Sequence, residues 1–136
     1  MKTSKKSLII RLLVILAGFI ILLYPVISDY VNTQNSGNAV NSYAGSVKKA
    51  TKKQRQQLFK KARAYNQALA KDPETFYHPD LVPGYASQLK VADTDVMAIV
   101  AIPKLRARLP VYHGTANSGL GDGIGHLRGT SLPIGG

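Results

Sequence analysis

A long apolar run near the N-terminus constrains the fold of this chain more than any other feature. Counted from Leu8 to Ser28 it holds about twenty residues, and at roughly 1.5 Å per residue a helix would cover the ~30 Å hydrocarbon core of a bilayer. Arg11 lies near one end, where its stem can reach the headgroups, and the next charged residue is Asp29. We therefore expect a membrane-spanning helix that ends or kinks at Pro25.

The charges that flank this run predict its orientation. Basic residues precede the run and an acid follows it; the basic residues are Lys2, Lys5, Lys6 and Arg11. The positive-inside rule then predicts a cytoplasmic N-terminus and an extracytoplasmic remainder, which is a single-pass protein of the cell membrane. A cleaved signal peptide is the competing interpretation, with a passable cleavage site at residues 26–28. Because the run is longer than a usual signal core and no Ala-x-Ala follows, we favour an uncleaved anchor over residues 1–28.

Residues 29–71 predict a linker and a basic helix. The stretch from Asn32 to Gly45 is rich in Asn, Ser and Gly, which is typical of a spacer or a weak helix. From Ser46 onward one set of side chains recurs every three or four residues and predicts one helix face: Val47, Thr51, Gln54, Leu58, Ala62, Tyr65 and Leu69. The other faces carry the cations Lys48, Lys49, Lys52, Lys53, Arg55, Lys60, Lys61 and Arg63.

This basic helix has two interpretations. In the one we favour, it lays Leu58, Tyr65 and Leu69 on a globular domain and leaves its cations in solvent. In the other, the basic face rests on anionic lipid, because each cation near such a surface gains about 1 kcal/mol. The two uses are compatible.

Residues 72–95 predict an irregular loop. Asp72-Pro73 stops the preceding helix, because the residue before a proline is driven out of the helical conformation. Further prolines and a glycine interrupt any regular element; they are Pro79, Pro83 and Gly84. A short helical turn follows, with Tyr85, Leu89 and Val91 on one side.

Residues 96–136 predict paired strands. Residues 97–102 form a short apolar run rich in β-branched side chains, which Pro103 closes. Residues 105–109 alternate apolar and charged side chains, so we expect a second, half-exposed strand that Pro110 interrupts. Because so little separates the strands, we expect them to pair antiparallel. The glycine-punctuated run that follows predicts turns, and the fold class is α+β.

Parts of this C-terminal third are similar to one known family. The stretches are Ile102–Lys104, Leu109–Thr115 and Gly123–Gly136. They resemble the start of the catalytic domain of class C, pilus-building sortases. Leu23–Ser28 resembles the end of that family's membrane segment, and Tyr65–Leu69 resembles its helix before the catalytic domain. The resemblance implies that residues 96–136 form the first strands of a sortase-type β-barrel, here incomplete.

The resemblance implies a cysteine transpeptidase. Such an enzyme cleaves a Leu-Pro-x-Thr-Gly-type sorting signal, holds the acyl group as a thioester and passes it to a lysine amine of the next pilin. The implied partners are pilins and membrane lipid, with no cofactor. In the family the catalytic His lies a short way beyond the double glycine, here Gly135-Gly136, and the Cys and Arg lie much further on. The sequence has no Cys, and a thiolate is the required nucleophile, so we expect a fragment without catalytic residues that is inactive alone.

The resemblance also assigns a role to the loop over residues 72–95. In many class C sortases a loop here covers the active site, anchored by an Asp-Pro-aromatic motif. This chain has Asp72 and Pro73, followed by Glu74, and the aromatic residues come later, at Phe76 and Tyr77. Asp72 and Pro73 are therefore lid candidates, and a simple helix stop is the alternative.

The histidines offer little catalytic or metal-binding potential. On paper Ser118, Ser131 and Asp122 can join His113 or His126 in a Ser-His-Asp set, but none lies in a nucleophile-elbow pattern. In the family that the chain resembles, both histidine positions are structural. A metal site that uses His78 as the third ligand has no ligand spacing to support it, so we expect no metal.

The formal charge of +11 raises the question of nucleic-acid binding, because clustered Lys and Arg neutralise phosphates. A membrane segment and the lack of any nucleic-acid motif count against it, so we expect no nucleic-acid partner. A second class of function is a small non-catalytic, membrane-tethered protein whose basic extracytoplasmic helix binds lipid or wall polymer. A frameshifted or degenerate sortase gene is a third interpretation.

Overall fold

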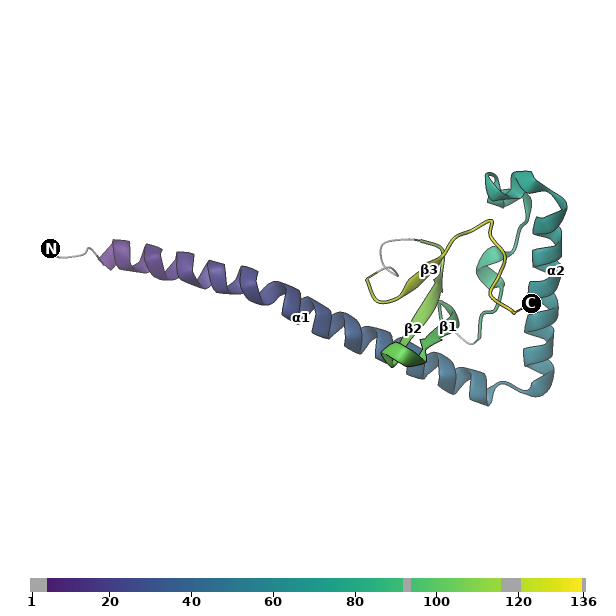
Figure 1. Ribbon diagram of the computed structural model, residues 1–136, viewed down its shortest axis with the longest axis horizontal. Helices are drawn as coiled ribbons and strands as arrows, with labels where there is room; N and C mark the ends of the chain where they lie inside the picture. The colour runs from purple at the N-terminus through teal and green to yellow at the C-terminus, as the bar shows by residue number, and fades with distance from the viewer. Residues whose placement is uncertain (1–4, 92–93, 116–120, 136) are drawn as a thin grey trace. The chain divides into compact units, whose positions relative to one another are not determined.

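The computed structural model describes residues 5–91, 94–115 and 121–135 (Figure 1). Two helices come first, α1 (Lys5–Lys49) and α2 (Lys52–Lys71). Three strands follow, β1 (Val96–Ile102), β2 (Ala107–His113) and β3 (Ile124–His126). The α+β class predicted from the sequence is confirmed. The chain divides into two compact units, Met1–Gln34 and Asn35–Gly136, and we describe each by itself.

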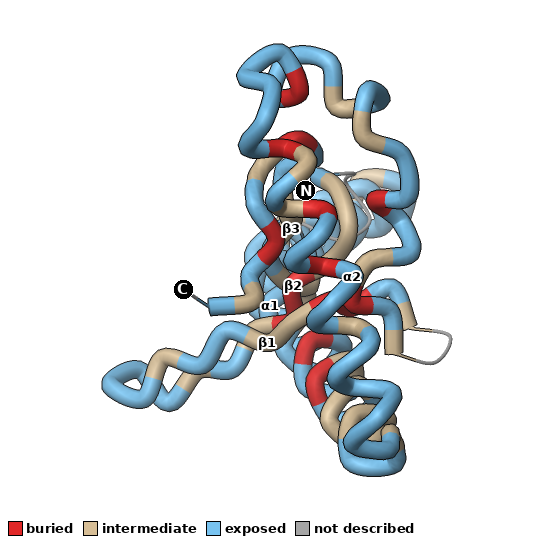
Figure 2. The backbone as a smooth tube through the Cα atoms, turned by 90° about the vertical axis from the view of Figure 1, so that its right-hand side faces the viewer, coloured by how far each residue is buried: buried red, intermediate tan, exposed pale blue. Residues whose placement is uncertain are grey.

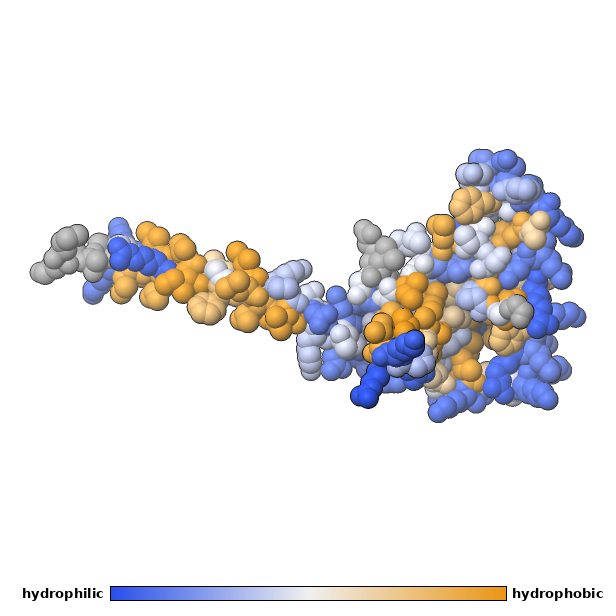
Figure 3. Space-filling view, in the orientation of Figure 1, coloured by the Kyte–Doolittle hydropathy of each residue, from blue (hydrophilic) through white to orange (hydrophobic). Residues whose placement is uncertain are grey.

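The first unit is the N-terminal part of α1, whose apolar side chains are exposed and appear orange in Figure 3. By length and composition α1 is able to cross a membrane, and these properties fit an anchor or a signal sequence equally. From the sequence we expected the helix to end or kink at Pro25. The helix does not end there but continues through the proline. A proline removes one backbone donor yet has a φ close to the helical value, so the turns on either side hold the helix together. Lys2 of the orientation argument lies outside the described residues.

A break at Ala50–Thr51 separates the two helices. The sequence left residues 32–45 open as a spacer or a weak helix, and the structure shows a helix there, because α1 continues to Lys49. The single helix predicted from Ser46 to Leu69 is instead interrupted. The cause is a capping box: the Gln54 amide donates to Thr51 Oγ1 at 3.2 Å, and Gln54 Oε1 accepts from the Thr51 amide at 2.8 Å. Because Thr51 adopts an extended conformation as an N-cap must, it starts a new helix.

The second unit has a core built on one face of α2. Ala62, Tyr65 and Leu69 are buried there, which confirms the predicted packing face for Tyr65 and Leu69, while Leu58 is half-buried. The core joins these residues to others from the loop, the sheet and the C-terminal stretch, namely Tyr85, Leu89, Met97, Val111 and Leu132 (Figure 2). The helix ends at Lys71, before Asp72-Pro73, as predicted.

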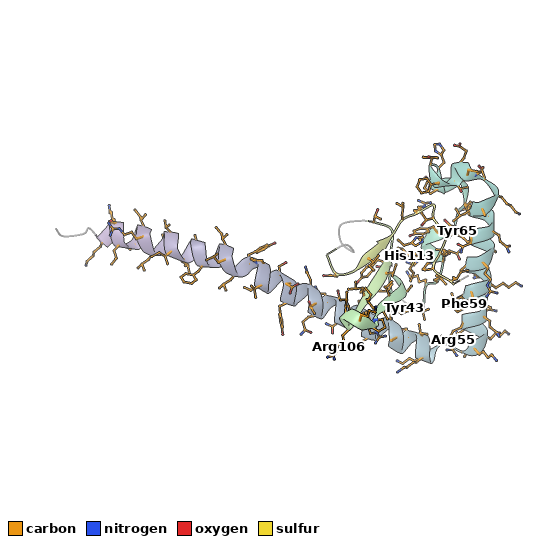
Figure 4. The ribbon with its side chains drawn as sticks, viewed as in Figure 1. Tyr43, Arg55, Phe59, Tyr65, Arg106 and His113 are labelled. Carbon is orange, nitrogen blue, oxygen red and sulfur yellow. The ribbon has the colours of Figure 1, made fainter. Side chains whose placement is uncertain are left out.

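The end of α1 also contacts the sheet. Tyr43, labelled in Figure 4, donates its hydroxyl to the Met97 carbonyl at 2.8 Å, and the Ser36 hydroxyl donates to the Asp122 carbonyl. Val40, between them on the helix, is buried. Residues 35–49 of α1 therefore pack against the rest of the second unit.

The sheet has the order β1-β2-β3, and β1 pairs antiparallel with β2 as predicted. The predicted start of the second strand is wrong, because Leu105 lies in a 3-10 turn and is 73% exposed. Arg106 takes a left-handed conformation and turns the chain into β2. Pro110 does not interrupt the strand: it pairs with Ile99 and is fully buried, so its packing offsets the missing donor.

Strand β3 was not expected from the sequence, which predicted only turns there. It pairs parallel with β2 through Val111, Tyr112 and His113. Gly123, just before β3, must be a glycine because its backbone lies close to β2. An added Cβ would overlap the Pro110 carbonyl oxygen and lie 2.9 Å from the Tyr112 ring. Three residues containing one glycine give no alternation signal, so long-range pairing alone defines this strand.

Candidate functional site

Tyr85 begins a 3-10 turn in the 72–95 loop, is 6% exposed and makes several polar contacts through its hydroxyl. Its hydroxyl accepts from the Gly114 amide at 2.8 Å and lies 3.0 Å from His126 Nδ1. The His126 ring stacks on the Tyr85 ring at 5.7 Å, and the His113 ring meets it edge-on at 5.5 Å. The loop, the end of β2 and β3 are thus joined at this residue.

The hydrogen bonds of His126 fix its role. Its Nε2 lies 3.0 Å from the Ser131 carbonyl, which only accepts, so Nε2 carries a proton. In the neutral ring Nδ1 is then an acceptor. The Tyr85 hydroxyl, which accepts from the Gly114 amide, has its single proton shared between His126 Nδ1 and the His126 carbonyl oxygen, each 3.0 Å away. Both ring nitrogens are occupied by the protein's own groups.

His113 is held in a similar way. Its Nε2 lies 2.7 Å from the Gln88 carbonyl and its Nδ1 lies 3.1 Å from the Asp95 carbonyl. Carbonyl oxygens offer no proton to a base, so this ring orients backbone and does not activate a nucleophile.

No Ser-His-Asp arrangement forms among residues 5–91, 94–115 and 121–135. Ser131 meets His126 through its backbone carbonyl, and Asp122 uses its carbonyl to accept from Ser36. Ser118 lies outside the described residues. Within the same ranges no three His, Asp or Glu side chains gather as metal ligands, and His78 lies exposed, 3.9 Å from Glu74.

An ion pair missed by the sequence analysis ties the loop to the C-terminal stretch. Arg128 Nη2 lies 2.6 Å from Asp80 Oδ1, and the guanidinium sits 5.9 Å from the centre of the Tyr85 ring. The pair joins residues far apart in sequence, so no local pattern announced it. Gly129 packs next to it: its φ is +88°, and an added Cβ would lie 2.9 Å from the Thr75 carbonyl oxygen.

The two lid candidates lie at the end of α2. Asp72 caps the 3-10 turn Pro73–Phe76, and its Oδ1 accepts from the Glu74 amide at 2.9 Å. Asp72 and Pro73 are exposed. After them Phe76 and Tyr77 form an exposed edge-to-face pair with ring centres 5.3 Å apart. This geometry fits a helix stop, and the lid role stays a prediction.

Burial keeps the interior phenols neutral. It raises the pKa of Tyr85, although the Gly114 hydrogen bond and then Arg128 act in the opposite direction. Burial also raises the pKa of Tyr65, whose hydroxyl finds no partner among the residues that the structure describes. The pKa values of Tyr43 and Tyr112 are raised by burial too. At neutral pH these side chains act as hydrogen-bonding and packing groups.

Comparison with known proteins gives one informative match. No family model matches this chain, and no curated protein matches it. Among solved structures, the crystal structure of sortase C1 from Streptococcus agalactiae is similar, with a TM-score of 0.60 and 31% identity. The match covers 73% of this chain and 52% of the sortase chain, so this chain spans about half the length of that protein. The matched part therefore has a sortase-like fold, as the sequence resemblance implied.

Proposed function

We propose that this chain forms the N-terminal part of a membrane-anchored class C sortase. The observation that carries the proposal is the similarity of its fold to sortase C1 from Streptococcus agalactiae at 31% identity. The conclusion is supported independently by Leu109–Thr115 and Gly123–Gly136, which read like the family's early catalytic domain. A fold alone does not fix an activity, so the substrate and the class follow from this likeness and need direct tests.

In this proposal each segment has its own task. Residues 8–28 anchor the protein with its N-terminus in the cytoplasm, as the flanking charges favour. Residues 29–71 connect the anchor to the domain in sequence, and α2 supplies part of the domain's core. Residues 72–95 form the lid. Residues 96–136 supply the first barrel strands.

The proposed chemistry is transpeptidation through a thiol. A cysteine thiolate attacks the threonine carbonyl of a Leu-Pro-x-Thr-Gly-type signal, the glycine amine leaves with a proton, and a thioester forms. A pilin lysine amine then attacks the thioester, which forms an amide and returns the thiol. A histidine carries the proton and an arginine stabilises the oxyanion. Because the 136 residues contain no Cys, the thiolate would come from sequence beyond Gly136, and the family resemblance places the catalytic His and Arg there too.

The test starts with the DNA downstream of the codon for Gly136. We expect an open frame that encodes a His, and much later a Cys and an Arg. The protein from that whole frame, in membranes, is mixed with a Leu-Pro-x-Thr-Gly peptide and a pilin, and mass spectrometry should find threonine joined to a pilin lysine. The matched Cys→Ala protein should form no such product. A frame without these residues, or an undiminished product from the Cys→Ala protein, would reject the proposal.

The cations of α2 favour a second candidate function, a tethered protein that binds anionic lipid or wall polymer without catalysis. They are exposed: Lys52, Lys53, Arg55, Lys60, Lys61 and Arg63. The ion pairs among the described residues include none of them. Such a stripe attracts polyanions by long-range charge. Anion-dependent retention without any transpeptidation by the whole-frame protein would favour this candidate over the first.

A further inference from the structure

A cavity of about 540 Å³ lies where the end of α1, the first turns of α2 and the loop residues 90–91 meet. This volume is within the range of small-molecule sites. The lining residues come from three separate parts of the chain; they are Ser46, Lys49, Ala50, Gln54, Gln57, Leu58, Lys61, Lys90 and Val91. The break at Ala50–Thr51 shapes the cavity, because an unbroken helix would not present Lys49 and Lys61 to one hollow.

The lining is cationic. Lys49, Lys61 and Lys90 contribute three ammonium groups, and no described lining residue is a carboxylate. Lys90 is paired with Asp95, whose Oδ1 lies 3.9 Å from Lys90 Nζ and whose side chain is 88% exposed. An ion pair of this length between exposed side chains contributes little, so among the residues that the structure describes the positive charge of the cavity is largely uncompensated.

Neutral groups in the lining also suit an anionic ligand, because several of them can donate hydrogen bonds. Gln57 offers amide donors and Ser46 a hydroxyl donor, both of which suit phosphate oxygens. Leu58 and Val91 give one side of the cavity an apolar surface that can contact carbon atoms next to a phosphate.

We propose that this cavity binds a phosphate-ester anion, either a lipid headgroup phosphodiester or a free phosphate such as pyrophosphate. Compact ammonium groups are well-known partners of phosphate, and three of them around one hollow match a multiply charged anion. The site shares Lys61 with the exposed stripe on α2, but it adds Lys49 from α1 and Lys90 from the loop, which the stripe lacks. It is also independent of the transpeptidase proposal, because no step of that chemistry uses it.

The test uses the full chain in maltoside micelles, which contain no phosphate, with calorimetric titration of two probes. Pyrophosphate represents free phosphate, and glycerophosphoglycerol represents a deacylated headgroup. One variant combines Lys49→Gln, Lys61→Gln and Lys90→Gln. The matched control combines Lys52→Gln, Lys53→Gln and Lys60→Gln, which removes the same charge from exposed lysines outside the cavity lining. Circular dichroism verifies that both variants fold.

We expect at least one probe to bind, with affinity reduced about tenfold or more in the cavity variant and by no more than about twofold in the control. The probe that binds more tightly identifies the source of the phosphate. Asp95→Asn should strengthen binding modestly, because it frees Lys90. Equal weakening in the two triple variants would assign binding to diffuse surface charge and overturn the proposal. Failure of both probes to bind at millimolar concentration would do the same.

Discussion

Asn66 on α2 and Leu132 near the C-terminus are joined by two hydrogen bonds. The Leu132 amide donates to Asn66 Oδ1 at 2.7 Å, and Asn66 Nδ2 donates to the Leu132 carbonyl at 3.2 Å. The side-chain amide thus satisfies both backbone groups of a residue that is 3% exposed. This contact fixes the C-terminal stretch against the helix and seats the Leu132 side chain in the core.

Replacing Asn66 by Ala should destabilise the second unit by about 1–3 kcal/mol, because the Leu132 amide loses its acceptor, while the Leu132 carbonyl keeps its second donor, the Ile134 amide. Asn66→Asp, which keeps one acceptor, should cost less. Hydrogen exchange of the Leu132 amide in the full chain measures the effect directly. An exchange rate unchanged by Asn66→Ala would show that the contact carries no stability.

The capping box that separates the helices gives a second prediction. Thr51→Ala should destabilise the start of α2 by about 0.5–2 kcal/mol, because the Gln54 amide loses its acceptor. Thr51→Ser retains the hydroxyl and serves as the control. The readout is hydrogen exchange of the amides at residues 52–54. If the amides at residues 52–54 exchange equally fast in Thr51→Ser and Thr51→Ala, the Thr51 hydroxyl does not cap the helix.

Gly123 and Gly121 form a matched pair. Gly123→Ala should destabilise the sheet by about 2 kcal/mol or more, because the methyl group meets the Pro110 carbonyl and the Tyr112 ring. Gly121→Ala places its methyl group in open space and should have little effect. Chemical denaturation followed by circular dichroism compares them. Similar losses from both substitutions would mean that β3 does not approach β2 as described.

Loss of the hydroxyl should change the unfolding free energy by different amounts at the two buried tyrosines Tyr65 and Tyr85. Tyr65→Phe should be nearly neutral at pH 7, because that hydroxyl has no partner among the described residues. Tyr85→Phe should destabilise the unit by about 1–3 kcal/mol, because the Gly114 amide loses its acceptor. Thermal unfolding of the full chain provides the comparison. A larger loss from Tyr65→Phe than from Tyr85→Phe would contradict this account of the core.

The raised pKa values of the buried tyrosines predict loss of stability in alkali. Burial raises the folded-state pKa of Tyr65 and Tyr85 above the unfolded value of about 10, so the folded state binds protons more tightly. Their contribution is fully present below pH ~10 and is lost as the pH rises through the folded-state pKa values. Unfolding free energy measured at increasing pH should fall there, and less steeply in Tyr65→Phe. Equal slopes in the two proteins would refute the assignment to Tyr65.

Local sequence determined the helices and strands that show a regular pattern of apolar side chains or a clear stop signal. The apolar run of residues 8–28 predicted the apolar part of α1, and the spacing of Tyr65 and Leu69 predicted the buried face of α2. Asp72-Pro73 marked the end of α2, and the β-branched run at residues 97–102 marked β1. In each case the deciding interactions lie within a few residues, where periodicity and backbone preference act.

Tertiary structure decided what depends on partners distant in sequence. Pro110 belongs inside β2 because the packed core compensates for its missing donor, and β3 exists because β2 offers it a partner. Tyr85 gathers two histidines from other segments, and Lys49, Lys61 and Lys90 meet around one cavity. No local pattern carries these contacts, because the free energy that selects them comes from bringing separate segments together.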